Sequence, residues 1–584
     1  MPVTLPRLSL RGGAALLLAL GIVAGPALAA SGASTSPVAR TAVAAAGTPV
    51  SFTLLVPLTV RPTATGLIDA TTLATYTAPL GMLTRQLDAV IGTPAVIGVD
   101  PMIIASIRVL GTDAPASALD WLARLQGLNN EVFALAYSDA DLASLARVDA
   151  LNLRDPIGFD TVIDPSHFGP AATASPTPTA AATGTPSPSP SPTAGNGSAK
   201  PALPTSTDEV LDWAYTLQHI AWPADDTLVS GDLSDLGAAG YKQVVLTSTN
   251  LSATDSGLVD LGSVQGVVAD AGVTSLVREA VSSSDPATLQ DALGRLNSAL
   301  GGMEAVSPGR TIVATLDRHW PLGSLNLSGL FADLGGQASV RTVGLSAVLA
   351  GAHPDARLTD EPGDAARTAS LRSILAATAQ EDSFATVADT PTAITEPRRL
   401  QLLSLLAVSW LRGTDDWATQ ANDYLTASVK LRSSVQIVGG SDLFVGAGST
   451  NIPVTVSNAL SVPVTVLVNV SSPSSVLQVQ KQNVALKIEP GSSNKAAIPV
   501  QALTNGTVTT SVTITSASGV PIGTPDSVRV DLQPGWESVG TTVIIVLLVL
   551  IFGGGIARNV VKRRAARRAD APVERSAEAE ADRD

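Results

Sequence analysis

The chain has 584 residues, of which 45% are hydrophobic and 15% charged, and its formal net charge is -14 at pH 7. At roughly 150 residues per domain the length allows up to about four domains, and the apolar fraction can fill their cores, which excludes global disorder. The absence of cysteine excludes disulfides, thiolate metal sites, a cysteine nucleophile and a lipoprotein anchor. Aromatic residues make up only 3%, whereas polysaccharide-degrading clefts and single-strand nucleic-acid grooves commonly use aromatic stacking.

Residues 1–29 have the pattern of an export signal. Arg7 and Arg11 precede an apolar run at residues 12–24, and Ala27, Leu28 and Ala29 form an A-x-A cleavage site. We therefore expect an exported chain that begins near residue 30 and has a flexible N-terminus up to residue 50. An uncleaved anchor is the alternative, although this apolar run is shorter than the ~20 residues that a membrane span needs.

A second apolar run, residues 539–557, contains no charge and as a helix covers about 28 Å, the thickness of a hydrocarbon core. Six basic residues follow it: Arg558, Lys562, Arg563, Arg564, Arg567 and Arg568. By the positive-inside rule they place residues 558–584 in the cytoplasm, where a disordered tail follows the basic cluster. We predict a single-pass protein of the cell membrane, with its N-terminal part outside and Trp536 at the outer interface.

The part of the chain expected outside the membrane is strongly acidic. It holds 26 basic and 44 acidic residues, which gives a net charge near −18. Such a surface repels phosphate backbones, so we predict no nucleic-acid partner.

Eight short apolar runs alternate with helical stretches in residues 51–169 and 205–363, a pattern typical of parallel strands buried on both faces. The runs are 51–58, 94–99, 131–137, 217–222, 243–247, 264–269, 310–316 and 340–345. We predict a multidomain protein whose head is a (β/α)-barrel-like α/β domain, with an open doubly wound sheet as the alternative. No glycine-rich nucleotide loop follows any run, so no nucleotide cofactor is expected.

Three further segments differ in composition from the head. Residues 170–204 hold nine prolines among Ser, Thr, Ala and Gly and predict an extended linker inserted into the head. Residues 364–433 predict a helical layer, in which Leu400 and Leu403 repeat at helical spacing and are expected to pack on the head. Residues 434–532 alternate apolar and polar positions between regular turn signals, which predicts an immunoglobulin-like β-sandwich.

Seven short segments carry a resemblance to a known family. They are 54–60 (LLVPLTV), 65–69 (TGLID), 86–88 (QLD), 98–101 (GVDP), 136–141 (AYSDAD), 222–224 (WPA) and 452–458 (IPVTVSN). With them the chain resembles an uncharacterised actinobacterial family of signal-peptide-bearing, single-pass membrane-anchored envelope proteins, often encoded beside the lipid II flippase. The resemblance implies a role in cell-envelope assembly by association only, and it supplies no catalytic residues.

Active sites of (β/α) barrels lie at the carboxyl ends of the strands, so polar and aromatic residues that follow the apolar runs are the candidates for a cleft. They are Asp100, Tyr137, Trp222, Asp225, Asp270 and His319, with Asp139 and Asp317 beside them. Asp100 and Asp270 are a possible acid and base pair for a glycosidic bond. An aspartate at a strand end is also a common helix cap, which is the simpler explanation for each and above all for Asp139.

Motifs for metal and nucleophile chemistry are missing. The four histidines, His167, His219, His319 and His353, form neither H-x-x-x-H nor H-E-x-x-H, and no G-x-S-x-G occurs, so neither a metal site nor a cofactor is predicted. We predict a non-catalytic binding or scaffold protein whose partner is a cell-wall glycan or an envelope-assembly protein. A glycan hydrolase with carboxylates at the barrel mouth is the alternative, and a spacer or adhesin without a ligand is a third hypothesis.

Overall fold

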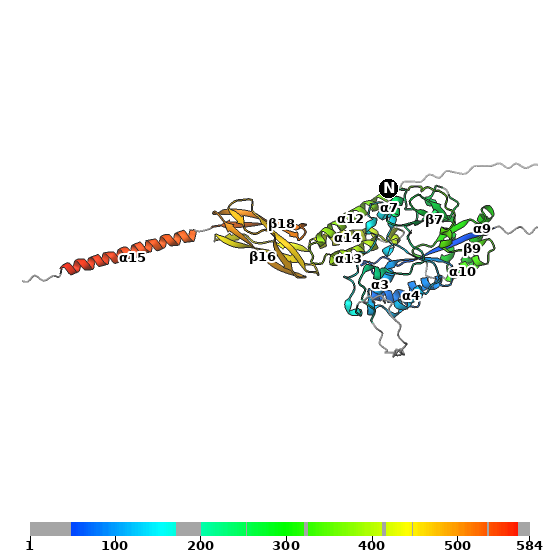
Figure 1. The fold of residues 1–584 in the computed structure, drawn as a ribbon, viewed down its shortest axis with the longest axis horizontal. Helices are drawn as coiled ribbons and strands as arrows, with labels where there is room; N and C mark the ends of the chain where they lie inside the picture. The colour runs from blue at the N-terminus through cyan, green and yellow to red at the C-terminus, as the bar shows by residue number, and fades with distance from the viewer. Residues whose placement is uncertain are drawn as a thin grey trace, which may run out of the picture. The chain divides into compact units, whose positions relative to one another are not determined.

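The computed structural model describes residues 48–170, 200–252, 254–320, 325–361, 363–411, 416–446, 448–533 and 536–569 (Figure 1). The expected export signal, the residues after it up to 47, most of the proline-rich segment and the tail after residue 569 lie outside these ranges.

The head contains one nine-stranded sheet. Its strands are β1 (Val50–Leu58), β2 (Val96–Val99), β3 (Val132–Ala134), β4 (Ile220–Ala221), β5 (Gln243–Thr247), β6 (Leu258–Asp260), β7 (Gln265–Ala269), β8 (Thr311–Thr315) and β9 (Val340–Thr342). The strand order is β3-β2-β1-β8-β7-β5-β4, with β6 paired to β7 and β9 paired to β1. Every pairing is parallel except that of β6 with β7.

The sheet curls until its two ends nearly meet. Phe133 lies in β3 and Trp222 directly follows β4, at opposite ends of the strand order, yet their ring centroids are 6.0 Å apart. Both rings belong to one buried cluster with Leu55 of β1, Val245 of β5 and Val313 of β8. Since alternate residues of a strand point to opposite faces, this cluster is the filling of the inner face.

The helices of the head cover the outer face of the sheet, where a second and larger apolar cluster lies. The helices on this face are α1 (Ala70–Thr77), α2 (Met82–Val90), α3 (Pro101–Arg108), α4 (Ala116–Gln126), α5 (Leu142–Ala146), α6 (Thr207–Leu211), α7 (Asp232–Ala238), α8 (Ala271–Ser282), α9 (Pro286–Val306) and α10 (Leu325–Gly335). The exception is α11 (Leu345–Leu349), which packs Leu345 and Val348 into the inner cluster. Figure 1 shows α9 and α10 beside strand β9. Aspartates begin several of these helices, because an Asp side chain at the N-cap accepts an otherwise unpaired backbone N–H of the first turn.

All eight predicted runs contain a strand of this sheet, but they do not close into a barrel. From β4 the strand order runs through β5, β7, β8, β1 and β2 to β3, as it would around a barrel. The pairing of β3 with β4 that would close the barrel is missing. The last run supplies β9, which pairs with Val50–Phe52 at the start of β1 instead of adding an eighth strand between β3 and β4. The head is therefore an α/β domain with an open, curled parallel sheet.

A helical layer follows the head. It comprises α12 (Ala365–Ala385), α13 (Thr392–Leu405), a short 3-10 helix at Val408–Leu411 and α14 (Trp417–Arg432). Leu400 and Leu403 of α13 are buried in the same core cluster as β1 and α3.

Residues 435–532 form two further sheets that share one core. The first has the order β10 (Val435–Val438), β12 (Ser449–Asn458), β16 (Ser492–Ala502) and β14 (Leu477–Val479). The second has the order β11 (Leu443–Val445), β18 (Pro521–Leu532), β17 (Gly506–Ser516), β13 (Val464–Ser471) and β15 (Val484–Ile488). Strict alternation in β13, where Val464, Val466, Val468 and Val470 are buried, directs one face of this sheet to the core.

The described chain ends in the long helix α15 (Trp536–Ala569). Among the described residues this is the one helix long and apolar enough to cross a membrane, over residues 540–565. The helix does not end at residue 557 but continues through Arg558, Lys562, Arg563 and Arg564 and on to the positions of Arg567 and Arg568. Its orientation across a membrane remains a prediction from these basic residues.

Candidate functional site: a cleft at the sheet seam

The carboxyl ends of the strands, where the candidates were expected, hold a buried ion pair. Arg318, which follows β8, donates from Nε and Nη2 to the Asp139 carboxylate at 3.1 Å each, and from Nη2 to the carbonyl of Trp222 at 2.6 Å. Its guanidinium also lies 4.4 Å from the centre of the Trp222 ring. The expectation from the sequence that Asp139 caps the following helix is wrong. The Asp139 carboxylate instead neutralises Arg318. The helix α5 begins after Asp141.

A second ion pair and a covering segment fill the rest of this mouth. Asp225 accepts from Arg278 at 3.0 Å, and Arg278 also donates to the backbone carbonyl and the hydroxyl of Thr315. Val408 and Ser409 of the helical layer lie over these groups and leave a cavity of about 10 Å³ that exposed His319 also lines. Such a volume holds a single water and no sugar ring.

Asp100 and Asp270 act as helix caps. Oδ1 of Asp100 accepts the N–H of Met102 at 2.9 Å at the start of α3, and burial raises the pKa of this carboxyl well above its ordinary value. Oδ1 of Asp270 accepts the N–H of Val273 at the start of α8, while Oδ2 lies 3.3 Å from Arg310. Neither aspartate lines the small cavity at the mouth.

The six candidates therefore do not converge on one cavity. Asp225 and His319 share the small mouth cavity, Trp222 is buried inside the curl, and Asp100 and Asp270 cap separate helices. Tyr137 lies elsewhere. Its hydroxyl donates to the Gly66 carbonyl at 2.9 Å, and its ring lines a cleft in the seam between β3 and β4.

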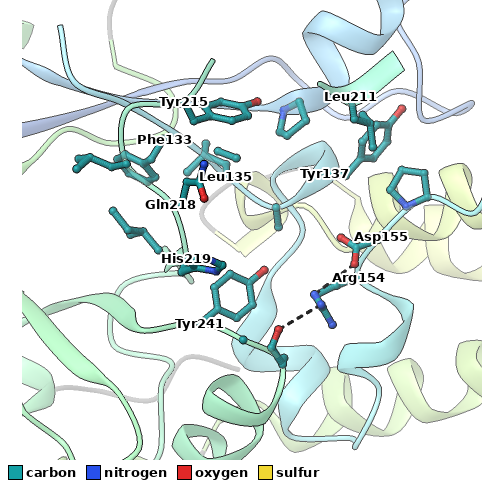
Figure 2. A pocket seen from close by; sticks show the side chains of 18 residues that line it. Phe133, Leu135, Tyr137, Arg154, Asp155, Leu211, Tyr215, Gln218, His219 and Tyr241 are labelled. Carbon is teal, nitrogen blue, oxygen red and sulfur yellow. Dashed lines mark hydrogen bonds and ion pairs between the residues drawn. The ribbon is translucent and has the colours of Figure 1, made fainter. Parts of the chain in front are cut away.

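This seam cleft, of about 330 Å³, was not predicted. One wall comes from β3 and the residues after it, 133–137, and the other from residues 217–220 that lead into β4. Figure 2 shows the rings of Phe133, Tyr137, Tyr215 and Tyr241 around an open space, with His219 at its edge.

Arg154 and Asp155 form the polar side of the seam cleft. Arg154 is held by the carbonyls of Leu151 and Ala239 at 3.0 and 3.2 Å, and its Nε lies 3.3 Å from Asp155 (Figure 2). Its guanidinium carbon is 5.9 Å from the Tyr241 ring centre. Burial raises the pKa of Tyr241 to about 12, although nearby Arg154 opposes this. The tyrosine hydroxyls of the cleft are thus neutral hydrogen-bonding groups at physiological pH.

The local backbone explains why the seam stays open. His219 has a left-handed conformation with φ 64°, uncommon for a residue with a side chain. Its carbonyl accepts the N–H groups of Lys242 and Gln243, at 2.9 and 3.2 Å. The bend turns the chain toward β5, so β4 pairs with β5 and β3 has no described strand paired to it on that side. A polar Gln218-His219 step within an otherwise apolar run is the signal in the sequence that marked this place.

Among the described residues no group of three or more histidine or acidic side chains is placed to hold a metal ion. The seam cleft offers one acidic side chain, already beside an arginine. It is suited to recognition through aromatic faces and hydrogen bonds.

Comparison with known proteins gives a family and weak structural likenesses. Residues 16–574 match a family described as a family of unknown function, DUF6049. No curated protein matches the chain. The 4-alpha-glucanotransferase from Thermococcus litoralis is 9% identical over 80% of this chain and 87% of its own, with a TM-score of 0.39.

Two likenesses cover only a sixth of the chain. Native Escherichia coli alpha-2-macroglobulin is 19% identical over 17% of this chain and 6% of its own, with a TM-score of 0.14. WR4, a Caenorhabditis elegans MSP family member, is 10% identical over 17% of this chain and 97% of its own, also at 0.14. The chain thus spans a small fraction of the macroglobulin's length. The expected membership of an uncharacterised family is confirmed, whereas the actinobacterial origin and the flippase neighbourhood stay predictions.

Proposed function

Because the chain belongs to this family of unknown function, we propose its role from its own geometry: an exported, membrane-anchored protein of the cell envelope whose head binds a partner without catalysis. Export rests on the signal pattern of residues 1–29, and anchoring on the apolar helix α15. The curled sheet is interpreted as an irregular barrel opened at one seam. The immunoglobulin-like domain predicted for residues 434–532 serves as a spacer between the head and the membrane.

The observation that carries this proposal is the contrast between the strand mouth and the seam. At the mouth, the Asp139 carboxylate forms an ion pair with Arg318, and the Asp225 carboxylate forms one with Arg278. The covering residues Val408 and Ser409 leave space for one water. A glycosidase requires two carboxyl groups that flank the scissile bond in an open site. The seam is open and aromatic, and among the described residues that line it Asp155 has no second carboxyl group to form such a pair.

The test is a turnover assay on isolated cell wall with the full-length protein in detergent. We expect no release of reducing ends above a control without protein, and normal complementation of a deletion strain by Asp100→Asn combined with Asp270→Asn. Removing a true general acid or base costs about 10² to 10⁴ in rate. Turnover that disappears in this double variant, or in Asp225→Asn, would overturn the proposal and establish the hydrolase alternative.

A matched pair of variants tests the seam itself. Tyr241→Ser removes a ring that lines the cleft, whereas Tyr76→Ser removes a tyrosine of α1 that does not line it. We expect complementation to fail in the first variant and to persist in the second, at equal protein levels. Equal complementation by both would remove the seam from the proposed function.

A further inference from the structure

The amino end of the seam shows that β3 accepts backbone partners on its open side. The N–H groups of Thr216 and Leu217 both donate to the Val132 carbonyl, at 2.9 and 3.0 Å. In return the Val132 N–H donates to the Thr216 hydroxyl at 2.7 Å. The chain itself thus occupies the pairing position beside Val132, and then leaves this edge at His219 to form β4.

The next position on this side of β3, Ala134, and Ala136 just after the end of the strand have no such neighbour. In the parallel ladder with β2, Leu135 donates to Val99 and Glu131 accepts from Ile97, so the odd-numbered residues face β2. The backbone groups of Ala134 and Ala136 therefore point into the seam. Within the described ranges, the N–H and C=O of Ala134 and the N–H of Ala136 have no hydrogen-bond partner, while the Ala136 carbonyl accepts from Asp139.

The surroundings of this edge suit an extended chain. Ala134 and Ala136 carry only methyl groups and are half-buried, so nothing large stands beside their backbone. Four aromatic rings line the space in front of it, those of Phe133, Tyr137, Tyr215 and Tyr241 (Figure 2). Across the gap, Ile220, which is buried, lies on the unpaired edge of β4, because β4 pairs with β5 and with no other described strand. The Tyr215 hydroxyl is buried and finds no hydrogen-bond partner in the described part of the chain.

We propose that the seam cleft binds an extended peptide segment of a partner protein, which adds as a strand to β3 at Ala134 and Ala136. This inference rests on the proposed binding function and names its ligand class. A peptide presents N–H and C=O groups to one side at every second residue, about 6.6 Å apart, which is the spacing of the unpaired groups on β3. A glycan lacks this regular alternation of donors and acceptors. Side chains of the added strand would then lie against the aromatic rings, which favours apolar or aromatic residues in the peptide.

Selection of peptides by the full-length protein in detergent provides the first test. A phage-displayed library of random nonapeptides is panned against the protein, and bound sequences are resynthesised with a single N-methyl group at each position in turn. Among the described residues, the Ala134 carbonyl is the unpaired acceptor on this edge, since the Val132 and Ala136 carbonyls already accept from the chain itself. Strand addition therefore predicts that methylation weakens binding about tenfold at one position, the peptide residue whose N–H donates to Ala134, because the methyl removes that backbone hydrogen bond. Indifference to N-methylation at every position, or failure to select any peptide, overturns the inference.

Two variants at one position provide the second test. Ala134→Pro removes the donor that faces the seam without removing a bond to β2, a change that an edge strand tolerates. Ala134→Ser keeps the N–H and differs little in size. We expect the proline variant to bind the selected peptides about tenfold more weakly and the serine variant to bind them unchanged, with equal melting temperatures. If both variants bind equally, β3 is not the partner; if the proline variant melts early, the N-methyl scan decides.

A third arm separates this inference from the proposed function. Soluble glycan strands from cell wall, with their peptides removed, are added to the same protein. Backbone hydrogen exchange of residues 131–137 is then measured. Protection by the glycan but not by selected peptides would overturn strand addition while the binding function stands. Turnover of the glycan would overturn the binding function itself. Protection by the peptides alone supports both proposals.

Discussion

Arg318 and Asp139, which are 179 residues apart in sequence, form a buried ion pair at the mouth of the curled sheet, with two N–O distances of 3.1 Å. Asp139 and its neighbour Ser138 both have left-handed backbones, with φ of 50° and 57°. Non-glycine residues adopt this conformation at a cost, and surrounding contacts must hold it. The ion pair thus both closes the mouth and holds the turn after β3, the strand that borders the seam.

Replacement of one partner of this pair should destabilise the head strongly. Arg318→Ala leaves the Asp139 carboxylate buried without a counter-charge, and we expect a loss of about 3–5 kcal/mol in the free energy of unfolding. The double variant Arg318→Met with Asp139→Asn removes both charges and should recover much of the loss. Urea unfolding followed by Trp fluorescence measures both. A loss below about 1 kcal/mol in Arg318→Ala would show that the pair does not hold the mouth.

Asp100 should make the stability of the head fall as the pH rises. Burial raises the pKa of its carboxyl in the folded chain, so above its ordinary value of 3.8 the folded state still binds a proton that the unfolded state has released. The stability contributed by the protonated form is therefore complete below pH 3.8 and is lost as the pH rises through the folded-state pKa.

Two substitutions at Asp100 separate its charge from its role as a cap. Asp100→Asn keeps an oxygen that can accept the Met102 N–H, and we expect it to be at least as stable as the wild type at pH 7 and to have a smaller pH slope above 3.8. Asp100→Ala loses the cap and should be about 1 kcal/mol less stable than the Asn variant. Thermal unfolding between pH 4 and 8 gives both quantities. A pH slope in Asp100→Asn equal to that of the wild type would assign the slope to other groups.

The two-sheet domain should depend on the helical layer. Phe384 and Ile394, from α12 and α13, are buried in the core of the two sheets. In addition, Thr465 of β13 donates to Asp389 at 2.7 Å. Phe384→Ala should therefore cost about 3–5 kcal/mol in the unfolding of residues 435–532.

Val429 of α14 provides the control for that substitution, since it is 59% exposed, and Val429→Ala should change stability by no more than about 0.5 kcal/mol. Hydrogen exchange of strands β13 and β17 reports on this domain separately from the head. Unchanged exchange in Phe384→Ala would mean that the sheets are stable without the helical layer, as expected if residues 434–532 fold alone.

The topology across the membrane follows from the basic residues after residue 557. With Arg558, Lys562, Arg563 and Arg564 on the cytoplasmic side, protease added to intact protoplasts should digest the chain up to about residue 536 and spare a tag fused after residue 584. Immunoblotting of the tag gives the result, with lysed protoplasts as the control. Digestion of the tag in intact protoplasts would reverse the orientation.

Local pattern in the sequence was sufficient for much of the fold. Each of the eight predicted apolar runs contains a strand of the head sheet, because a strand buried on both faces needs a short continuous apolar run. Alternation at residues 464–470 predicted β13, and helical spacing of Leu400 and Leu403 predicted their burial, since both periods follow from backbone geometry alone. The charge-free run of residues 539–557 predicted the apolar helix by length.

The seam and the closed mouth were decided only by tertiary structure. Whether β3 pairs with β4 depends on the bend at His219 and on which strand edge lies nearest, and no periodicity in the sequence encodes that choice. The roles of Asp139 and Asp225 likewise depend on arginines far away in the chain, Arg318 and Arg278. An aspartate after a strand has the same local pattern whether it is a catalyst, a cap or half of an ion pair, because its role is set by the groups that folding brings within about 3 Å of its oxygens.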